Sequence, residues 1–346
     1  MLRVLIIDDS VFIRTILSDI LSKDPHIEVV GKASNGKEGL DKIRELRPDI
    51  VTLDIEMPEM DGLQILRQLK YLKERPKVVI LSTLTSADAK CTKQALLLGA
   101  DDFMLKPRNI GTVKGISAEF ATKLRQLHTI PVRPAGSTKK VSTKPAGTIV
   151  LIGSSAGGPP MLDAILSGMD PDLDAAVVIT QHMPEGFTAA LAERLDKISP
   201  LPVKETETGD ILYSGHVYLS RGGYHTLITR DMNASGTREG RITHSKSAPL
   251  HAVRPAVDLT FTSAAKVFGP HVVSFILSGM GNDGGEGALA IKNAGGINMV
   301  VQESECLVYG MARSALQRNC VDKVIPLVRI PREMKRTVEE MSQRHV

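Results

Sequence analysis

The amino-acid sequence predicts an α/β protein with two doubly wound, mostly parallel-sheet domains, the second of which carries a β-hairpin element. Along its 346 residues, short apolar segments of strand character alternate with segments of helical periodicity. This alternation is typical of parallel sheets covered by helices on both faces. It is interrupted at residues 129–147, where three prolines, two glycines and a lack of apolar periodicity indicate a linker. We therefore expect one domain at 1–128 and another at 148–346.

The first domain contains five strand-and-helix units. Each strand is a short apolar run, and the segment after it carries apolar residues three or four apart, as in Ile13, Ile16 and Leu17. Strands are expected at 2–8, 27–33, 49–54, 77–82 and 101–105. Helices are expected at 10–22, 37–46, 63–72, 87–98 and after Thr112.

The second domain repeats the α/β pattern with an insertion. Residues 203–245 are rich in β signals, and we expect them to form hairpins beside the main sheet. The main strands are expected at 148–154, 175–181, 271–278 and 297–302. Helices are expected after each of the first two strands and at 255–268, 287–293, 311–317 and 332–344.

Composition argues against nucleic-acid binding and membrane insertion. The net charge of +4 is accounted for by four basic and no acidic residues in the expected linker, and seven Phe, five Tyr and no Trp leave little for base stacking. No apolar run approaches the ~20 residues that cross a bilayer, and the N-terminus lacks the apolar core of a signal peptide. Three cysteines without a CxxC pair suit a reducing compartment and give no metal framework. We expect a cytoplasmic protein.

Polar side chains gather after the strands of the first domain. Asp8 and Asp9 follow the first strand, Asp54 ends the third, Ser82 ends the fourth, and Lys106 follows the fifth. Because the carboxyl ends of parallel strands share one crevice, these side chains are expected to converge. Any one acid is as readily explained as a helix cap. Together they favour a Mg²⁺ site in which a carboxylate accepts a phosphoryl group, with the ammonium and hydroxyl groups holding its oxygens.

This arrangement resembles the response-regulator receiver domain over the whole of 1–128. The resemblance is carried by the Asp8-Asp9 pair, the LDIEMPEMDG stretch around Asp54, Ser82, and the Lys106-Pro107 pair. It implies that Asp54 accepts a phosphoryl group from a histidine kinase. It also implies that Mg²⁺ is bound by Asp9, Asp54 and Glu56.

The second domain opens with a glycine-rich turn, GSSAGG, between a strand and a helix. Such a turn can bind a dinucleotide pyrophosphate, but Ser155 stands where that motif needs glycine, and the acid expected after the next strand is absent. Read as Gly153-x-Ser155-x-Gly157, the turn instead matches a nucleophile elbow, which exposes a serine hydroxyl above the sheet. Nucleotide binding is the weaker interpretation.

A base and an acid follow two other strands. His182 comes directly after the strand at 175–181, and Asp283 lies in the GMGNDGG loop after the strand at 271–278. Together with Ser155 they form a candidate nucleophile, base and acid, each beyond the carboxyl end of a parallel strand. The sequence therefore predicts a serine hydrolase site at one edge of the second sheet.

Simpler interpretations exist for each member of this set. Taken alone, Ser155 is as readily explained as a helix cap as it is as a nucleophile. His182 taken alone could be a surface residue, and Asp283 a turn residue. Ser154 is an adjacent rival nucleophile, but only Ser155 has the elbow position. A Ser–Asp–His order using Asp258 and His271 is rejected because neither follows the end of a core strand.

The second domain resembles the chemotaxis protein-glutamate methylesterase (CheB) family, and the order receiver, linker, catalytic domain matches as well. The resemblance is carried by GSSAGG, the QHMP around His182, HAVRPAVD at 251–258 and SGMGNDGGEGALAIKNAGG. Departures are small: Ser154 stands where alanine is common, Ala156 where threonine is common, and Asn282 in a variable position.

This resemblance implies a function for the whole chain. Ser155, His182 and Asp283 are the implied triad, and the amides of Ala156, Gly157 and Met280 are the expected oxyanion donors. The implied reaction removes methyl groups from γ-glutamyl esters of methyl-accepting chemotaxis receptors, with deamidation of receptor glutamines as a second activity. No cofactor is expected for hydrolysis. The unphosphorylated receiver is expected to block the catalytic crevice, and phosphorylation to open it.

Overall fold

The structure is a computed structural model that describes residues 1–72, 74–82, 91, 94–96, 98–106, 120–122, 124–125, 127, 139–232 and 238–343. It divides into two compact units, Met1–Ile130 and Pro131–Val346. Each unit has its own central sheet. Most of the helix expected at 87–98, nearly all of the one expected after Thr112, and Pro107 lie outside the described residues.

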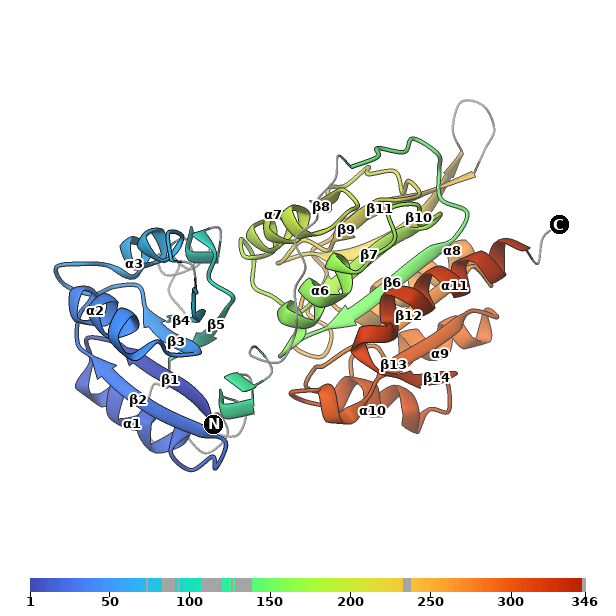
Figure 1. Ribbon diagram of the computed structural model, residues 1–346. Helices are drawn as coiled ribbons and strands as arrows, with labels where there is room; N and C mark the ends of the chain where they lie inside the picture. Colours follow the sequence, from blue (N-terminus) through green and yellow to red (C-terminus); the bar gives the residue numbers. More distant parts are fainter. Residues whose placement is uncertain are drawn as a thin grey trace. The chain divides into compact units, whose positions relative to one another are not determined.

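The first unit contains a five-stranded sheet with the strand order β2-β1-β3-β4-β5 (Figure 1). All of its pairings are parallel, which confirms the prediction of a doubly wound parallel sheet. The strands are β1 (Leu2–Ile7), β2 (Ile27–Ala33), β3 (Ile50–Asp54), β4 (Lys77–Ser82) and β5 (Asp102–Leu105). The helices are α1 (Val11–Leu21), α2 (Gly36–Leu46) and α3 (Gly62–Leu69).

A polar side chain caps the start of each of these three helices. Ser10, Asn35 and Asp61 each accept a hydrogen bond from the backbone amide three residues further on. Such caps satisfy amides that have no partner inside the helix. Since Ser10 caps α1, the carboxylate of Asp9 is not used as the cap and remains at the end of β1.

The second unit contains a seven-stranded, all-parallel sheet with the order β14-β13-β12-β6-β7-β9-β8, plus the separate antiparallel hairpin β10-β11 (Figure 1). The strands are β6 (Ile149–Ser154), β7 (Ala176–Gln181), β8 (Val203–Glu205), β9 (Val217–Leu219), β10 (His225–Met232), β11 (Arg238–Ser245), β12 (Val272–Ile276), β13 (Ile297–Val301) and β14 (Lys323–Ile325). The α-helices are α6 (Gly158–Ser167), α7 (Thr188–Ile198), α8 (Val257–Phe268), α9 (Gly285–Asn293), α10 (Gly310–Gln317) and α11 (Ile330–Gln343). Two short 3₁₀ helices are η1 (Glu303–Glu305) and η2 (Leu327–Arg329).

The prediction of hairpins throughout 203–245 is wrong for its first half. Among the described residues of this range, β10 and β11 alone form a hairpin, whereas β8 and β9 extend the main sheet in parallel with β7. The physical reason is burial: all three residues of β9 are buried, as in a strand covered on both faces, and α7 provides the crossover that parallel strands need. The three-residue strand β14 was not predicted.

The described part of the expected linker, residues 139–147, is attached to the second unit. Lys139, Lys140 and Lys144 form ion pairs with Asp196, Asp172 and Asp174 respectively. The backbone amide of Ala146 also donates to the carbonyl of Leu212 at 2.9 Å, and Ser214 donates to Lys144 at 2.9 Å. The three lysines of the described part of the linker therefore have acidic partners in this unit.

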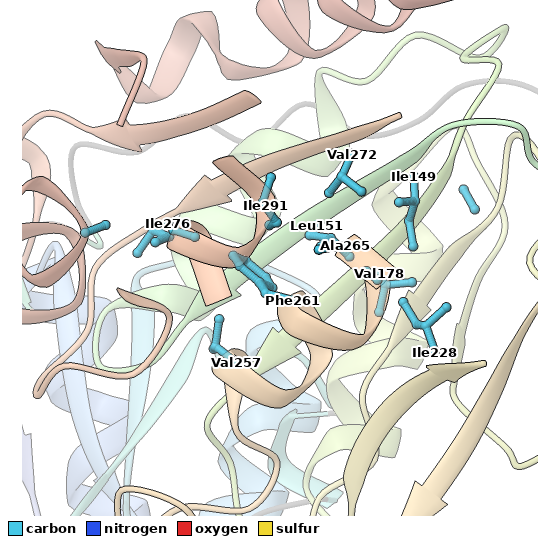
Figure 2. Packing of buried hydrophobic residues seen from close by; sticks show 14 of the residues in the cluster. Ile149, Leu151, Val178, Ile228, Val257, Phe261, Ala265, Val272, Ile276 and Ile291 are labelled. Atoms are coloured by element: carbon cyan, nitrogen blue, oxygen red, sulfur yellow. The ribbon is translucent and has the colours of Figure 1, made fainter. Parts of the chain in front are cut away.

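Helix α8 packs on the sheet of the second unit through one face. Val257, Phe261 and Ala265 are four residues apart, so they share a stripe of the helix, and they are buried against Leu151 of β6 and Ile276 of β12 (Figure 2). Phe261 is fully buried. This contact fixes where the N-terminus of α8 lies.

Gly153 allows the close approach of α8 to β6. A Cβ atom at this position would lie 2.6 Å from Cγ1 of Val257 and 3.3 Å from the ring of Phe261. Any larger residue would push the first turns of the helix away from the end of the strand. The first glycine of the GSSAGG turn thus has a packing role that the nucleophile-elbow pattern alone does not reveal.

The composition predicts neither a membrane-spanning helix nor a disulfide. Among the described residues, no helix is both long and apolar enough to cross a membrane. The three cysteines form no disulfide with one another. Cys320 is fully buried, and its Sγ donates to the carbonyl of Ala315 at 3.2 Å, so it acts as a packing residue.

We predict that Phe261→Ala destabilises the second unit by about 3–5 kcal/mol, because it removes a buried ring and leaves a cavity between α8 and the sheet. The measurement is urea denaturation of the full chain, following the transition of the second unit. Val328→Ala is the control: Val328 is 78% exposed, and a change of no more than about 0.5 kcal/mol is expected. Equal midpoints for both variants would contradict the packing described for α8.

Candidate functional site

The acids expected to converge in the first unit meet around Lys106. Its Nζ lies 3.0 Å from Oδ2 of Asp8 and 2.6 Å from Oδ2 of Asp54. Carboxylate oxygens of Asp8, Asp9 and Asp54 lie within 4.8 Å of one another. Beside them is a cavity of about 220 Å³ lined by Asp9, Asp54, Ile55, Glu56, Leu81, Ser82 and Lys106.

Burial controls the electrostatics of this acidic pocket. Asp54 is only 4% exposed, and burial raises its pKa to about 6 despite the hydrogen bond from Lys106. The pKa of Asp8 is also raised, again mainly by burial. Two of the three carboxylates, those of Asp8 and Asp54, share the ammonium group of Lys106. The excess of oxygen ligands fits a divalent cation such as Mg²⁺, which Asp8, Asp9 and Asp54 could hold.

In the second unit, Ser155 lies on a tight turn between β6 and α6. Its backbone amide donates to the carbonyl of Ser278 at 2.9 Å, and the amide of Gly158 donates to the carbonyl of Ser155 at 2.9 Å. Gly157 takes the left-handed conformation that the turn needs, with φ of 78°. The turn presents Ser155 half-buried at the end of the sheet, next to Gly279, where a Cβ atom would lie 3.0 Å from Cβ of Ser155.

The neighbouring Ser154 has a different environment. It is fully buried, and its Oγ donates to Oε1 of Gln181 at 2.5 Å. The Gln181 Nε2 donates to the carbonyls of Ser155 at 2.9 Å and His182 at 3.1 Å. A Cβ atom on Gly158 would lie 2.1 Å from that Oε1, so glycine is needed there. Ser154 therefore supports the turn, and its hydroxyl has no exposed surface from which to act.

His182 and Asp283 lie together at the same edge of the sheet. Ser154 and Gln181 are register partners in β6 and β7, so Ser155 and His182 are the next residues along two adjacent strands. The Nε2 of His182 lies 2.6 Å from Oδ2 of Asp283. With the carboxylate ionised, Nε2 carries the proton and donates it, and Nδ1 is the ring nitrogen left to accept a proton.

Helix α8 binds the carboxylate of Asp283 at its N-terminus. The backbone amide of Val257 donates to Oδ2 at 2.7 Å, and that of Asp258 donates to Oδ1 at 2.8 Å. Burial raises the pKa of Asp283, but the hydrogen bonds from His182 and from these two amides outweigh it and lower the pKa below its ordinary value. Asp283 is therefore an anion at neutral pH.

A second histidine–aspartate pair adjoins the first and was missed by sequence reasoning. Nε2 of His251 lies 2.8 Å from Oδ2 of Asp258, whose Oδ1 accepts from the amide of Gly287 at 2.7 Å. Burial raises the pKa of Asp258. Asp258 therefore pairs with His251 and not with His271. The signal in the sequence was the HAVRPAVD stretch, which contains both partners.

His251, Asp258 and Asp283 have ligand atoms within 4.8 Å of one another, which is a spacing that a metal ion could use. However, both carboxylates already accept hydrogen bonds from backbone amides and from histidines. Each of the four carboxylate oxygens thus already accepts at least one hydrogen bond from the protein itself. The geometry favours a proton-transfer site over a metal site.

The expected oxyanion donors lie beside Ser155. Ala156 and Gly157 follow it directly, and Met280 follows Gly279, which contacts Ser155. Within the described part of the chain, the backbone amides of Ala156, Gly157 and Met280 donate no hydrogen bond. Unpaired amides beside a serine are suitable donors for a negatively charged oxygen.

Two family models match the chain, one in each unit. The model of the CheB methylesterase matches residues 150–334. The model of the response regulator receiver domain matches residues 4–116. The two matches fall on the units that contain the serine site and the acidic pocket respectively.

Similar proteins align over nearly the full chain. A protein-glutamate methylesterase/protein-glutamine glutaminase 1 from Methanospirillum hungatei JF-1 is 57% identical over 343 residues, covering 99% of this chain and 100% of that protein. A protein-glutamate methylesterase/protein-glutamine glutaminase from Pyrococcus abyssi is 38% identical, covering 98% of this chain and 94% of that protein. The crystal structure of the Thermotoga maritima CheB methylesterase catalytic domain is 38% identical with a TM-score of 0.53, covering 56% of this chain and 100% of that one.

We predict that Asp54→Asn reduces a pH-dependent loss of stability in the first unit and leaves the part that comes from the raised pKa of Asp8. The pKa of Asp54 is about 6 in the folded chain against 3.8 ordinarily, so the folded state binds more protons between these values, and its stability falls as the pH rises through them. The loss should be at most about 3 kcal/mol. Denaturation of the full chain between pH 4 and about 8 in the presence of a chelator measures it.

Asp41→Asn is the matched control for this prediction, since the Asp41 side chain is 65% exposed. This variant should keep the pH dependence of the wild type. The assignment of the raised pKa to Asp54 is wrong if the asparagine variant at position 54 keeps that dependence in full.

Proposed function

The chain belongs to the CheB methylesterase family, and on this premise we propose how its two sites work together. It is a phosphorylation-activated hydrolase that removes methyl groups from γ-glutamyl methyl esters of methyl-accepting chemotaxis receptors and also deamidates receptor glutamines, in chemotactic adaptation. The observation that carries this proposal is the 2.6 Å contact between His182 and Asp283 beside the turn that presents Ser155. Residues 1–128 are the receiver, 129–147 the linker and 148–346 the catalytic domain.

Ser155 is the nucleophile of the proposed reaction. Its Oγ attacks the ester carbonyl carbon while Nδ1 of His182 takes the hydroxyl proton, and the carbonyl oxygen becomes an oxyanion. When the tetrahedral intermediate collapses, the bond to the methoxy oxygen breaks and His182 returns the proton to give methanol. Water then adds to the acyl-serine by the same proton transfers and releases glutamate. With a glutamine side chain, ammonia leaves in place of methanol.

Asp283 and the unpaired amides provide the electrostatic part of the mechanism. Asp283 accepts a hydrogen bond from the Nε2–H of His182, fixes the ring and stabilises the imidazolium that forms after Ser155 loses its proton. The amides of Ala156, Gly157 and Met280 are the oxyanion donors, and one such donor typically contributes about 3 kcal/mol to the transition state. Since helix α8 holds Asp283 in place before substrate binds, this arrangement needs no reorganisation during the reaction.

In the receiver, Asp54 is the proposed phosphoacceptor and a histidine kinase the phosphodonor. Asp9, Asp54 and Glu56, with Asp8, would hold Mg²⁺, which when bound offsets the negative charge of the phosphoryl oxygens. Lys106 lies 2.6 Å from the Asp54 carboxylate and would bind the phosphoryl group after transfer, together with the hydroxyl of Ser82.

We predict that Ser155→Ala lowers kcat for methanol release from methylated receptors by roughly 10⁴ or more, because it removes the nucleophile while leaving the fold intact. Ser154→Ala is the matched control: it removes a buried hydroxyl that only supports Gln181, so the loss should be far smaller. Circular dichroism of both variants checks the fold. Undiminished esterase activity of the alanine variant at position 155 would show that the nucleophile is misassigned.

We predict that a small-molecule phosphodonor such as acetyl phosphate, with Mg²⁺, accelerates methanol release by the full chain but not by Asp54→Asn, which lacks the acceptor carboxylate. If the receiver blocks the catalytic crevice, a 139–346 fragment should be faster than the unphosphorylated full chain. The fragment begins at 139 because residues from there onward are attached to the second unit. Equal rates for fragment and unphosphorylated chain would rule out blocking.

A further inference from the structure

Most basic side chains of the second unit are neutralised by a carboxylate. Arg194 pairs with Asp163, Lys144 with Asp174, and Lys335 with Asp170, among others. Within the described residues, Arg221, Lys246 and Arg254 form no ion pair. These three are close to one another, through the Tyr224 ring and the loop at Arg254, whereas Lys266, another cation without an ion pair, lies at the far end of α8.

Two loops carry these three cations to the edge of the site. Gly222, next to Arg221, packs on the segment after His182. A Cβ atom added at Gly222 would lie 2.4 Å from the carbonyl oxygen of Pro184. Arg254 stands three residues before Val257, whose amide binds the Asp283 carboxylate. The loops that carry the cations therefore contact the segment after His182 and lead into the helix start that binds Asp283.

The side chain of Arg254 is used to hold a neighbouring loop. Its Nη1 donates to the carbonyls of Lys246 and Ser247 at 3.0 and 2.9 Å. The buried His225 holds the same loop, with Nδ1 accepting from the amide of Ala256 and Nε2 lying 3.1 Å from the carbonyl of Ala248. The backbone that carries Lys246 is thus held by hydrogen bonds from Arg254 and by the contacts of the buried His225.

Tyr224 holds the other two cations without neutralising them. The guanidinium carbon of Arg221 lies 5.1 Å and Nζ of Lys246 lies 4.8 Å from the centre of the Tyr224 ring. Cation–π contacts of this kind position a positive charge while leaving it uncompensated by an anion. Four acids lie nearby: Glu185 packs against Gly223, and Glu205, Glu207 and Asp210 act on His244 beside Tyr224. Within the described residues none of them pairs with Arg221 or Lys246, since Glu207 and Asp210 pair with Lys204 and Glu205 accepts from Thr188. The surface formed by Arg221, Tyr224 and Lys246 therefore carries two positive charges that no ion pair neutralises within the described residues.

We propose that this surface binds the carboxylates that flank the reacting ester on the receptor. The inference rests on the proposed function, and it follows from the chemistry of that substrate. Each hydrolysed site becomes a glutamate, so a receptor segment with several such sites presents carboxylates next to its remaining esters. Arg221 and Lys246 attract that acidic segment and bring its ester to Ser155, and binding becomes tighter as flanking esters are hydrolysed.

The test compares two peptides that carry one γ-glutamyl methyl ester, one flanked by glutamates and the other by glutamines. Binding is measured to the phosphodonor-treated full chain carrying Ser155→Ala, which does not consume the peptide. Adding Arg221→Gln and Lys246→Gln should weaken binding of the glutamate peptide about three- to tenfold and leave the glutamine peptide unchanged. Adding Lys266→Gln, the matched control, should change neither. Raising the salt concentration should reproduce the loss.

Equal weakening of both peptides, or of neither, overturns the proposal. Hydrolysis by chains with an intact Ser155 is measured in parallel, with p-nitrophenyl acetate as a small neutral ester. The double glutamine variant should raise KM for the glutamate peptide and leave the rate with the small ester unchanged. If the glutamate peptide binds through the cations but its ester is never hydrolysed, the proposed function fails while the docking surface stands.

Discussion

The structure of the catalytic site depends on how the carboxylate of Asp283 is held. Three donors converge on it: Nε2 of His182 and the amides of Val257 and Asp258. The two amides are available only because α8 starts there, and α8 starts there because Phe261 is buried against the sheet and Gly153 allows close contact. The electrostatics of the catalytic site therefore depend on core packing. A helix displaced from the sheet would leave the Asp283 carboxylate without its two amide donors.

In each unit the site lies at the carboxyl ends of the strands of that unit's own sheet, but the electrostatics of the two sites differ. In the first unit, carboxylates crowd around one lysine, and burial raises the pKa of Asp54 to about 6, so the pocket favours an added positive charge. In the second unit, amides and a histidine lower the pKa of Asp283, so its negative charge is already satisfied. The first pocket is suited to bind a cation and the second to polarise a histidine.

Much of the fold and site could be predicted from sequence because polar residues at the ends of apolar strands mark the edge of the sheet. Asp54 and His182 were placed in this way. Strand β9 was misread because three buried residues resemble half of a hairpin as closely as a parallel strand. His251 was missed because its partner Asp258 lies in the first turn of a helix, where no strand end points to it. Which of two adjacent serines faces outward depends on the turn geometry, which periodicity does not describe.

The binding of Asp283 by backbone amides also provides an internal reporter. The amide protons of Val257 and Asp258 can exchange with deuterium only when the carboxylate moves away or the first turn of α8 opens. Their isotope exchange rates therefore measure the fraction of molecules in which the acid is out of place. Hydrogen exchange at these two amides thus reports how often the active site of the catalytic domain is assembled.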